Sequence, residues 1–256
     1  MEQLDKKEFF NSMAKSIFSI IPYAGTAITE LVFEYNGRIR QKRLNKFVEF
    51  LSEGFLNQNE LDIENIKTEH FNDVFEAVIK RVFTTKSETK LKRFRDILIK
   101  ELKSQHSETE LIEIYLELIS ILSDEEIIIL HEHRHFDKNY NLELDHRNEL
   151  NDRLNQAIEN KKKETIVIGQ SKFSDTIAKV TVELELINKK HKKLECLRKF
   201  DYYNITDEKF LFYKQRLYSK GLLIDSGIGR IGVDTFQMMS ITEFGKEFVE
   251  FIKEAN

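Results

Sequence analysis

The sequence predicts a mainly α-helical protein whose last part forms a small β-hairpin between two helices. The 256 residues contain one proline and nine glycines, the residue types that most disfavour a helix interior, and 33% of the side chains are charged. Apolar residues also recur three and four positions apart through most of the chain, which is the spacing of an amphipathic helix. We expect a helical domain over residues 1–107 and a helical, winged-helix-like domain over residues 108–256.

The N-terminal domain is expected to be a helical bundle. Its first helix covers Leu4–Ile20 and ends before Pro22, because proline cannot donate the helical hydrogen bond and disfavours helical geometry in its predecessor. A second helix carries apolar residues from Ile28 to Phe55 on one stripe, and two more cover about residues 63–83 and 88–105.

The centre of the chain continues the helical pattern less uniformly. Residues 107–121 predict a helix, and Ser123 with Glu126 forms a capping box that opens the next one. A polar insert follows near residues 134–172, where the helical spacing is weak and a mobile hairpin is one interpretation.

Residues 173–194 carry apolar side chains at alternating steps of four and three, the spacing of a coiled-coil seam. Such a seam predicts a long packed helix and also favours a homodimer. Strict alternation of Val180, Val182, Leu184 and Leu186 leaves a strand over residues 178–187 as the alternative.

The last fifty residues predict helix, hairpin and helix, as in the second half of a winged helix. Thr206 is the expected N-cap of the first helix and Gly221 its C′ residue. Two β-prone runs then flank the glycine-rich tip at residues 227–232, and a helix over about residues 241–252 closes the chain. The tip matches G-x-G-x-x-G, but a strand rather than a helix follows it, so we interpret it as a turn and expect no bound cofactor.

A winged helix most often binds nucleic acid or a protein partner. The candidate contact residues on its first helix and at the wing tip are Lys209, Lys214, Gln215, Arg216, Lys220 and Arg230. Apolar and aromatic residues fill most other positions of that helix, and Asp207 and Glu208 lie beside it. This composition favours a protein partner, with DNA as the alternative.

One motif predicts metal chemistry. His131-Glu132-His133-Arg134-His135 matches H-E-x-x-H, in which two histidines on one helix face bind zinc and the glutamate acts as general base. Glu149 or His146 is the candidate third ligand. The alternative is an exposed, histidine-rich helix end, which leaves zinc and a catalytic Glu132 as the minority interpretation.

Composition bounds the remaining function classes. The net charge is −4, which argues against general nucleic-acid binding, although basic runs occur near residues 38–46 and 86–103. A single cysteine, Cys196, fits a reducing compartment, and no signal peptide or transmembrane span is apparent, so we expect a cytoplasmic protein. Membrane contact by Ile17, Phe18, Ile20 and Ile21 around the Pro22 break is a further alternative.

Three segments resemble a known family. They are Leu122–Leu130 (LSDEEIIIL), Tyr213–Leu223 (YKQRLYSKGLL) and Ile241–Phe248 (ITEFGKEF). Together they resemble the Abi-alpha (abortive-infection alpha) group of bacterial phage-defence proteins, mainly over residues 108–256. The resemblance implies a bacterial setting, a helical N-terminal part and a role in anti-phage defence, and it supplies no catalytic residues.

The function expected from these observations is that of a non-enzymatic interaction or effector protein in bacterial anti-phage defence. It would recognise a protein partner through its winged-helix-like domain. The alternatives are a DNA-binding transcriptional regulator, a zinc-dependent hydrolase that uses residues 131–135, and a membrane-disrupting effector.

Overall fold

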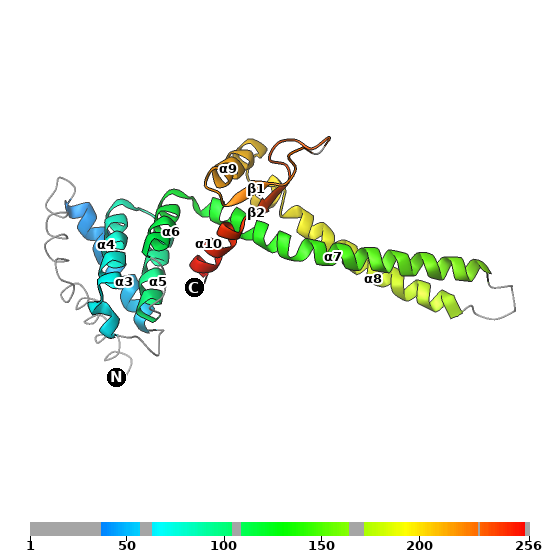
Figure 1. The fold of residues 1–256 in the computed structure, drawn as a ribbon, viewed down its shortest axis with the longest axis horizontal. Coiled ribbons are helices and arrows are strands. Elements are labelled where there is room, and N and C mark those ends of the chain that lie inside the picture. The colour runs from blue at the N-terminus through cyan, green and yellow to red at the C-terminus, as the bar shows by residue number, and fades with distance from the viewer. Residues whose placement is uncertain (1–36, 57–62, 104–108, 164–171, 230, 254–256) are drawn as a thin grey trace. The chain divides into compact units, whose positions relative to one another are not determined.

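The computed structural model describes residues 37–56, 63–103, 109–163, 172–229 and 231–253 (Figure 1). The first expected helix, its Pro22 break and the membrane-contact candidates Ile17, Phe18, Ile20 and Ile21 lie outside the described residues. The described part is mainly helical, with one small antiparallel sheet of two strands. None of its helices combines the length and apolarity that a bilayer crossing requires.

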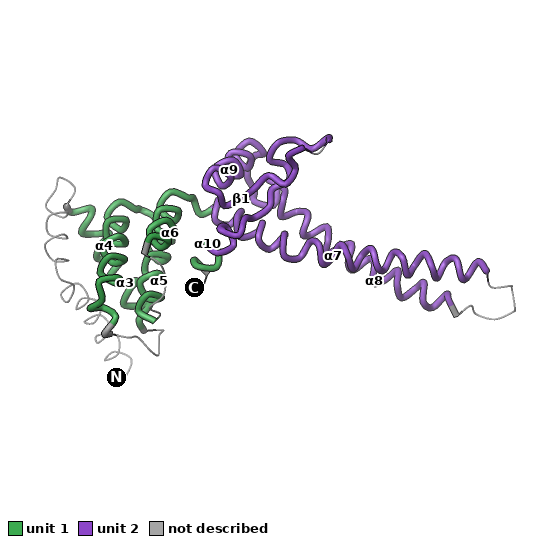
Figure 2. The backbone as a smooth tube through the Cα atoms, in the orientation of Figure 1, with its two compact units in different colours: residues 1–124, 248–256 green, residues 125–247 purple. Residues whose placement is uncertain are grey.

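The chain divides into two compact units, residues 1–124 with 248–256 and residues 125–247 (Figure 2). The first unit includes the helix that follows residue 107, because this helix packs against the preceding helices. The domain boundary that the sequence predicts after residue 107 remains a prediction.

Unit 1 is a bundle of amphipathic helices. Its described elements are α3 (Gly37–Leu56), the 3-10 turn η1 (Ile63–Lys67), α4 (Glu69–Thr84), α5 (Glu88–Lys103) and α6 (Thr109–Ile121). Helix α3 packs on α4 and α5, and α4 packs on α6. The largest side chains that the bundle buries completely include Phe47, Phe55, Phe71 and Phe94. From the end of the chain, Phe248 and Phe251 pack on Tyr115 with ring centroids 5.5 and 4.6 Å away.

Unit 2 begins with two long helices that lie side by side and antiparallel (Figure 1). They are α7 (Asp124–Lys163) and α8 (Lys172–Cys196). The polar insert expected near residues 134–172 is helical up to Lys163, and α8 confirms helix rather than strand for residues 178–187.

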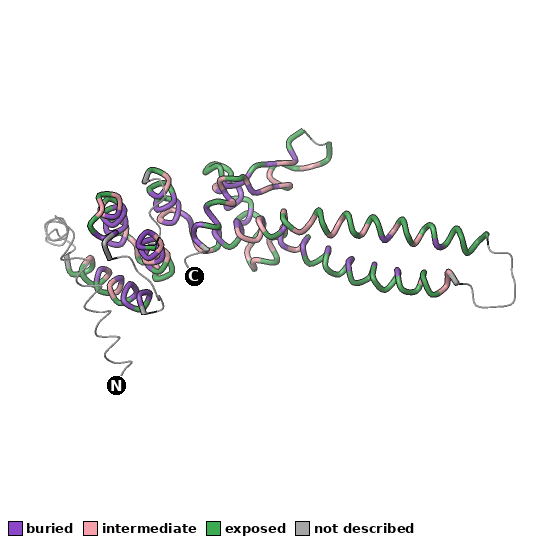
Figure 3. The backbone as a smooth tube through the Cα atoms, turned by 60° about the horizontal axis from the view of Figure 1, so that its bottom comes forward, coloured by how far each residue is buried: buried purple, intermediate pink, exposed green. Residues whose placement is uncertain are grey.

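Figure 3 shows that the outer halves of α7 and α8 are mostly exposed. Only a narrow seam is buried between them, where Leu150 packs with Val180, Leu184 and Ile187. The heptad-like seam that favoured a homodimer is therefore used within the chain. We call this outer part, residues 141–163 and 172–193, the arm.

The rest of unit 2 packs at the base of the arm, and we call residues 125–140 and 194–247 the head. It contains the 3-10 turn η2 (Phe200–Tyr203), α9 (Asp207–Ser219), β1 (Leu223–Asp225), β2 (Met239–Ile241) and the start of α10 (Glu243–Lys253). The two strands pair Leu223 with Ile241 and Asp225 with Met239. Helix α9 packs on η2 and β1.

Candidate partner-binding surface

Both ends of α9 are fixed by the residues expected from the sequence. The Thr206 hydroxyl accepts a hydrogen bond from the Lys209 amide at 3.3 Å. At the other end Gly221 has a φ of 70°, its amide donates to the Tyr218 carbonyl, and the Leu222 amide donates to the Leu217 carbonyl. This pair of bonds is the Schellman motif, which requires the left-handed conformation that glycine adopts at little cost. The direction in which α9 presents its side chains is thus set locally.

The outer side of α9 carries three exposed apolar residues among polar ones. Phe210 and Leu217 are buried on the inner face, whereas Leu211, Phe212 and Tyr218 remain 36%, 51% and 41% exposed. Exposed aromatic residues gathered on one helix face are typical of surfaces that dock a protein partner. We call Leu211, Phe212 and Tyr218 the α9 face.

Two of the basic residues expected to reach a ligand are instead used inside the head. Lys214 is 8% exposed, its Nζ donates to the Phe236 carbonyl at 2.7 Å, and burial lowers its pKa. Arg216 forms an ion pair at 3.1 Å with Glu126, whose side chain is completely buried. Because a buried carboxylate needs a cationic partner, Arg216 has a structural role.

Three of the other four candidates belong to the described residues, and all three are exposed. Lys209 is exposed and its Nζ lies 5.4 Å from the centroid of the Tyr213 ring. Gln215 and Lys220 are exposed on α9 and at its C-cap, and Arg230 lies outside the described residues. The surface of α9 therefore offers fewer cations than its sequence suggests.

Asp225 holds the hairpin closed. Its Oδ1 accepts a hydrogen bond from the Gly227 amide at 2.8 Å, and its Oδ2 accepts one from the Phe236 amide at 2.7 Å. Phe236 has a φ of 64°, an uncommon conformation for a bulky residue, and its amide and carbonyl are both bound, the carbonyl by Lys214. One carboxylate thus joins the two sides of the loop.

Beyond this closure the tip of the hairpin is exposed and apolar. Ile228 is 70% exposed and Ile231 fully exposed. The adjacent Gly229 and Gly232 have φ values of 82° and 79°, so the turn depends on glycine at both positions.

Two side chains from the long helices bind the outer edge of β2. Asp137 on α7 accepts a hydrogen bond from the Ile241 amide at 2.7 Å, and Arg198, just after α8, donates to the Met239 carbonyl. A third strand would supply the same donor and acceptor, so the two side chains close the sheet edge. Burial raises the pKa of Asp137 and lowers that of Arg198. We did not predict either contact from the sequence.

His133, the central residue of the histidine-rich motif, lies inside the head. It is completely buried, and its Nδ1 donates to the Ile129 carbonyl at 2.8 Å. Burial lowers its pKa to about 4, and the nearby charges of Arg198 and Lys214 act in the same direction. The side chain is therefore neutral near pH 7.

The two outer histidines of the motif have other partners. His131 Nδ1 lies 3.4 Å from Glu132 Oε1, and His135 Nδ1 accepts a hydrogen bond from the Asn139 side chain at 3.2 Å. Glu149 is on the same continuous helix, roughly 21 Å along the axis from His135, since each residue adds about 1.5 Å. Glu149 is thus not brought to the histidines, and neither is His146 on the same helix. Among the described residues, no group of three or more His, Cys, Asp or Glu side chains converges as for a metal ion.

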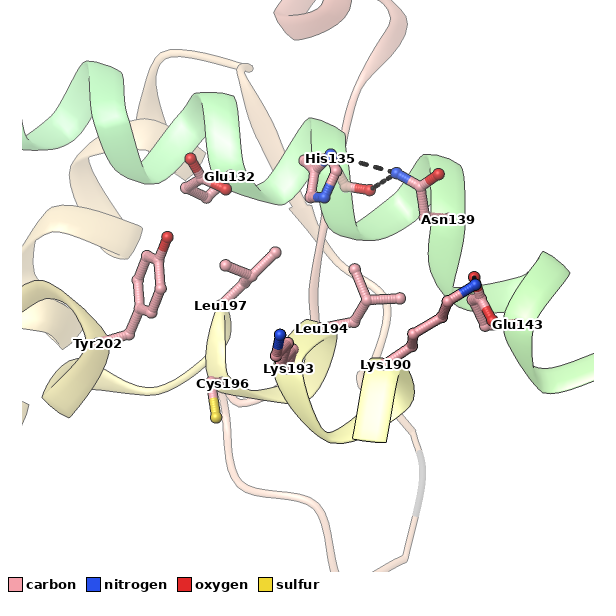
Figure 4. Close-up of a pocket in the computed structure, with 10 residues that line it drawn as sticks. All are labelled: Glu132, His135, Asn139, Glu143, Lys190, Lys193, Leu194, Cys196, Leu197 and Tyr202. Atoms are coloured by element: carbon pink, nitrogen blue, oxygen red, sulfur yellow. Dashed lines mark hydrogen bonds and ion pairs between the residues drawn. The ribbon is translucent and has the colours of Figure 1, made fainter. Parts of the chain in front are cut away.

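Glu132 and His135 line a groove between α7, α8 and η2 (Figure 4). The cavity has a volume of about 630 Å³; its other lining residues are Asn139, Glu143, Lys190, Lys193, Leu194, Cys196, Leu197 and Tyr202. In Figure 4 Leu194 and Leu197 lie along the groove, and the Cys196 sulfur points away from α7. The rim carries both signs of charge, with Lys190 and Glu143 3.8 Å apart. This arrangement aligns no nucleophile with a general base.

Ring contacts connect this groove to α9. Tyr202, which is 51% exposed, packs edge-on against Tyr203, and Tyr203 stacks on Phe210 of α9 with centroids 5.3 Å apart. The Tyr203 hydroxyl donates to the Leu197 carbonyl at 2.7 Å. Tyr203 thus contacts both α9 and a residue that lines the groove.

Comparison of the chain with family models, with curated proteins and with solved structures finds no match. The geometry of the head is thus the main basis for a functional conclusion.

Proposed function

We propose that this chain is a non-enzymatic interaction protein of bacterial anti-phage defence, which recognises a protein partner in the cytoplasm through the α9 face. The order α9, β1, β2, α10 supports a winged-helix-like domain, a kind of module that binds nucleic acid or protein. The observation that carries the proposal is the exposure of Leu211, Phe212 and Tyr218 on a helix whose ends are fixed. A preorganised apolar face costs little conformational entropy when it binds.

The disposition of the basic residues favours protein over DNA. A recognition helix for DNA needs several cations directed toward phosphates and base edges. In α9, Lys214 and Arg216 are bound inside the head, and the exposed Asp207 and Glu208 add negative charge to the first turn. The exposed side chains of Leu211, Phe212 and Tyr218 would gain little from contact with a phosphate backbone.

The setting in phage defence rests on the resemblance of Leu122–Leu130, Tyr213–Leu223 and Ile241–Phe248 to the Abi-alpha group. These segments form the start of α7, the α9–β1 junction and the β2–α10 junction. All three belong to the elements that build the head or continue from it. The lone cysteine agrees with a reducing compartment.

The test combines protection against phage with partner capture. Bacteria that express the chain are challenged with a phage panel, and the double variant Leu211→Ser/Phe212→Ser is compared with Val182→Ser/Leu186→Ser. The second pair is also apolar, is 58% and 56% exposed, and lies on the arm. We expect the α9 variant to lose at least about tenfold in protection, the equivalent of roughly 1.4 kcal/mol of binding, and the arm variant to retain it.

A photo-crosslinking residue placed at position 212 should give a discrete protein adduct during infection, and one placed at position 186 should not. Equal behaviour of the two double variants, or no protection against any phage tested, would contradict the proposal. Loss of protection in Lys209→Gln/Lys220→Gln, with Leu211→Ser/Phe212→Ser unaffected, would instead support a DNA-binding regulator.

A further inference from the structure

The two basic runs of the sequence meet at one groove in unit 1. The groove lies between the first half of α3 and the turn from α4 to α5, and it has a volume of about 520 Å³. Its lining residues are Ile39, Lys42, Arg43, Asn45, Lys46, Glu49, Thr85, Lys86, Glu88 and Leu91. Segments about forty residues apart in the sequence therefore contribute cations to the same cavity.

The charge of this groove is predominantly positive. Four cations, Lys42, Arg43, Lys46 and Lys86, line the groove with the two carboxylates Glu49 and Glu88. Among the described residues both carboxylates pair with Lys46, at 3.9 and 3.8 Å. The two glutamate side chains are 66% and 65% exposed, so these ion pairs contribute little and exchange readily with solvent. Within the described residues no carboxylate lies within ion-pair distance of Lys42 or Lys86.

Arg43 is the preorganised member of the group. It is half-buried, and its Nη1 donates to the Phe83 carbonyl near the end of α4. This bond uses part of the guanidinium and fixes the orientation of the remaining donors. A fixed planar fork is well suited to the oxygens of a phosphate or carboxylate.

Nearby contacts concentrate further positive charge. Lys46 and Lys92 both lie over the ring of Phe50, with Nζ 5.0 and 5.2 Å from its centroid. Two ammonium groups at one aromatic ring repel each other, and an anion beside them would relieve that repulsion. The groove also has apolar walls, because Leu91 is buried beneath it and Ile39 is 54% exposed at its edge.

We propose that this groove binds the phosphate groups of a small phosphorylated metabolite of nucleotide size. Arg43 and the lysines of α3 and the α4–α5 turn contact the phosphates, and Ile39 with Leu91 contacts the organic part. The volume lies within the range of small-molecule sites. A small ligand is favoured over a nucleic acid because Glu49 and Glu88 flank the cations and the chain carries a net charge of −4, which would repel a long polyanion. The site is independent of the α9 face.

Calorimetric titration of the full-length chain with ATP and with tripolyphosphate at low salt tests this proposal. Lys42→Gln/Lys86→Gln should weaken both ligands at least about tenfold, because both lysines are exposed and line the groove. Ile39→Ser should weaken ATP and leave tripolyphosphate unchanged, since only ATP carries an organic part. Thermal unfolding of each variant confirms that it folds.

The matched control is Lys179→Gln/Lys189→Gln, which removes the same charge from exposed positions on α8. We expect this pair to bind both ligands as the unmodified chain does. If the two double variants bound the ligands equally weakly, the loss of affinity would come from net charge alone, and the proposed site would be wrong. The absence of binding by ATP and tripolyphosphate at millimolar concentration, including the case in which a single-stranded oligonucleotide alone binds, would also overturn the site.

Discussion

The bundle of unit 1 and the head of unit 2 both bury charged side chains, but in the head several of these side chains bind a short hairpin. In the bundle, Asp96 pairs with its neighbour Arg95, and Glu101 accepts a hydrogen bond from His70 at 2.8 Å. In the head, buried Glu126 likewise pairs with the Arg216 side chain, but four other buried or half-buried charges bind main-chain groups of the hairpin. These bonds join Asp225 to Gly227 and Phe236, Lys214 to Phe236, Asp137 to Ile241 and Arg198 to Met239.

The size of the elements explains this difference. Four- to six-turn helices with wide apolar stripes bury enough side-chain surface to fix their own positions. Strands of three residues do not, because a short two-stranded hairpin is marginally stable alone. Side chains from α7, from α9 and from the segment just after α8 therefore supply the hydrogen bonds that further strands would provide. We infer that apolar packing sets the stability of the bundle, and that a few polar contacts set that of the head.

The largest expected effect tests the first half of this comparison. Phe94→Ala removes a completely buried ring from α5 and should destabilise the bundle by about 3–5 kcal/mol. Amide hydrogen exchange, followed peptide by peptide, should show lost protection in α3, α4 and α5. Ile114→Ala, at a position that is 48% exposed on α6, is the control and should change protection little. Unchanged protection in α5 of Phe94→Ala would contradict an apolar origin of the bundle's stability.

Asp225→Ala tests whether a few polar contacts set the stability of the head. The change removes the acceptor of two main-chain amides. It also removes a nearby carboxylate whose charge, in the unmodified chain, raises the pKa of Lys214. Hydrogen bonds to a charged group contribute about 1.5–3 kcal/mol each, so we expect a loss of about 3 kcal/mol, measured by hydrogen exchange in β1, β2 and α9. Protection in the bundle should persist. Asp234→Ala, an exposed position in the same hairpin, is the matched control.

Contacts between residues close in the sequence could be predicted, whereas contacts between distant residues could not. Thr206 and Gly221 were correctly predicted as helix ends, because capping involves residues within one turn. Asp137 was not predicted, because it binds Ile241, 104 positions away, and no local pattern relates the two. The sheet of the described residues has two strands, and the side chains that bind the outer edge of β2 leave no local pattern in the sequence.

The inward position of Lys214 was predictable in principle. It lies four residues after Phe210 and three before Leu217, both on the buried face of α9. Lys214 was predicted to contact a ligand because it is basic, although its position in the helix places it on the buried face. The groove between α3 and the α4–α5 turn was not predicted, for another reason. Its two basic runs are about forty residues apart in the sequence and converge through the packing of α3 on α5.

Acidification should lower the stability of the head and raise the stability of the bundle. Burial lowers the pKa of His133 from 6.5 to about 4, so below about pH 6.5 the unfolded chain takes up a proton that the folded head does not. Stability of the head should therefore fall, by about 2 kcal/mol between pH 7 and 5. Burial raises the pKa of Asp96 from 3.8 to about 6, so the folded bundle binds a proton that the unfolded chain releases, and its stability should rise.

The measurement is the difference in hydrogen exchange between the unmodified chain and a non-titrating variant at each pH, which cancels the intrinsic pH dependence of exchange. His133→Gln should flatten the pH dependence of α9, and Asp96→Asn should flatten that of α5. If both units lost stability equally on acidification, and neither substitution changed the slope, these two groups would not be its source.

The smallest expected effect is the difference between alanine substitutions at two closely packed glycines, one in each unit. A Cβ at Gly245 would lie 2.3 Å from the Leu222 carbonyl oxygen, a main-chain atom of the hairpin that cannot move alone. A Cβ at Gly54 would meet Ile99 Cδ1 at 2.4 Å and Arg95 Cδ at 2.8 Å, both toward the ends of flexible side chains. Replacement by alanine favours either helix by about 1 kcal/mol through helix propensity.

In Gly54→Ala this gain should offset the rearrangement of Ile99 and Arg95, so the net change in the free energy of unfolding stays near zero. In Gly245→Ala the start of α10 must move away from the hairpin, and overpacking of this kind costs about 1–3 kcal/mol. Hydrogen exchange at β1 and β2 should report the loss. Equal losses at the two positions would mean that the bundle, too, is held by contacts with the main chain, and the contrast between the units would fail there.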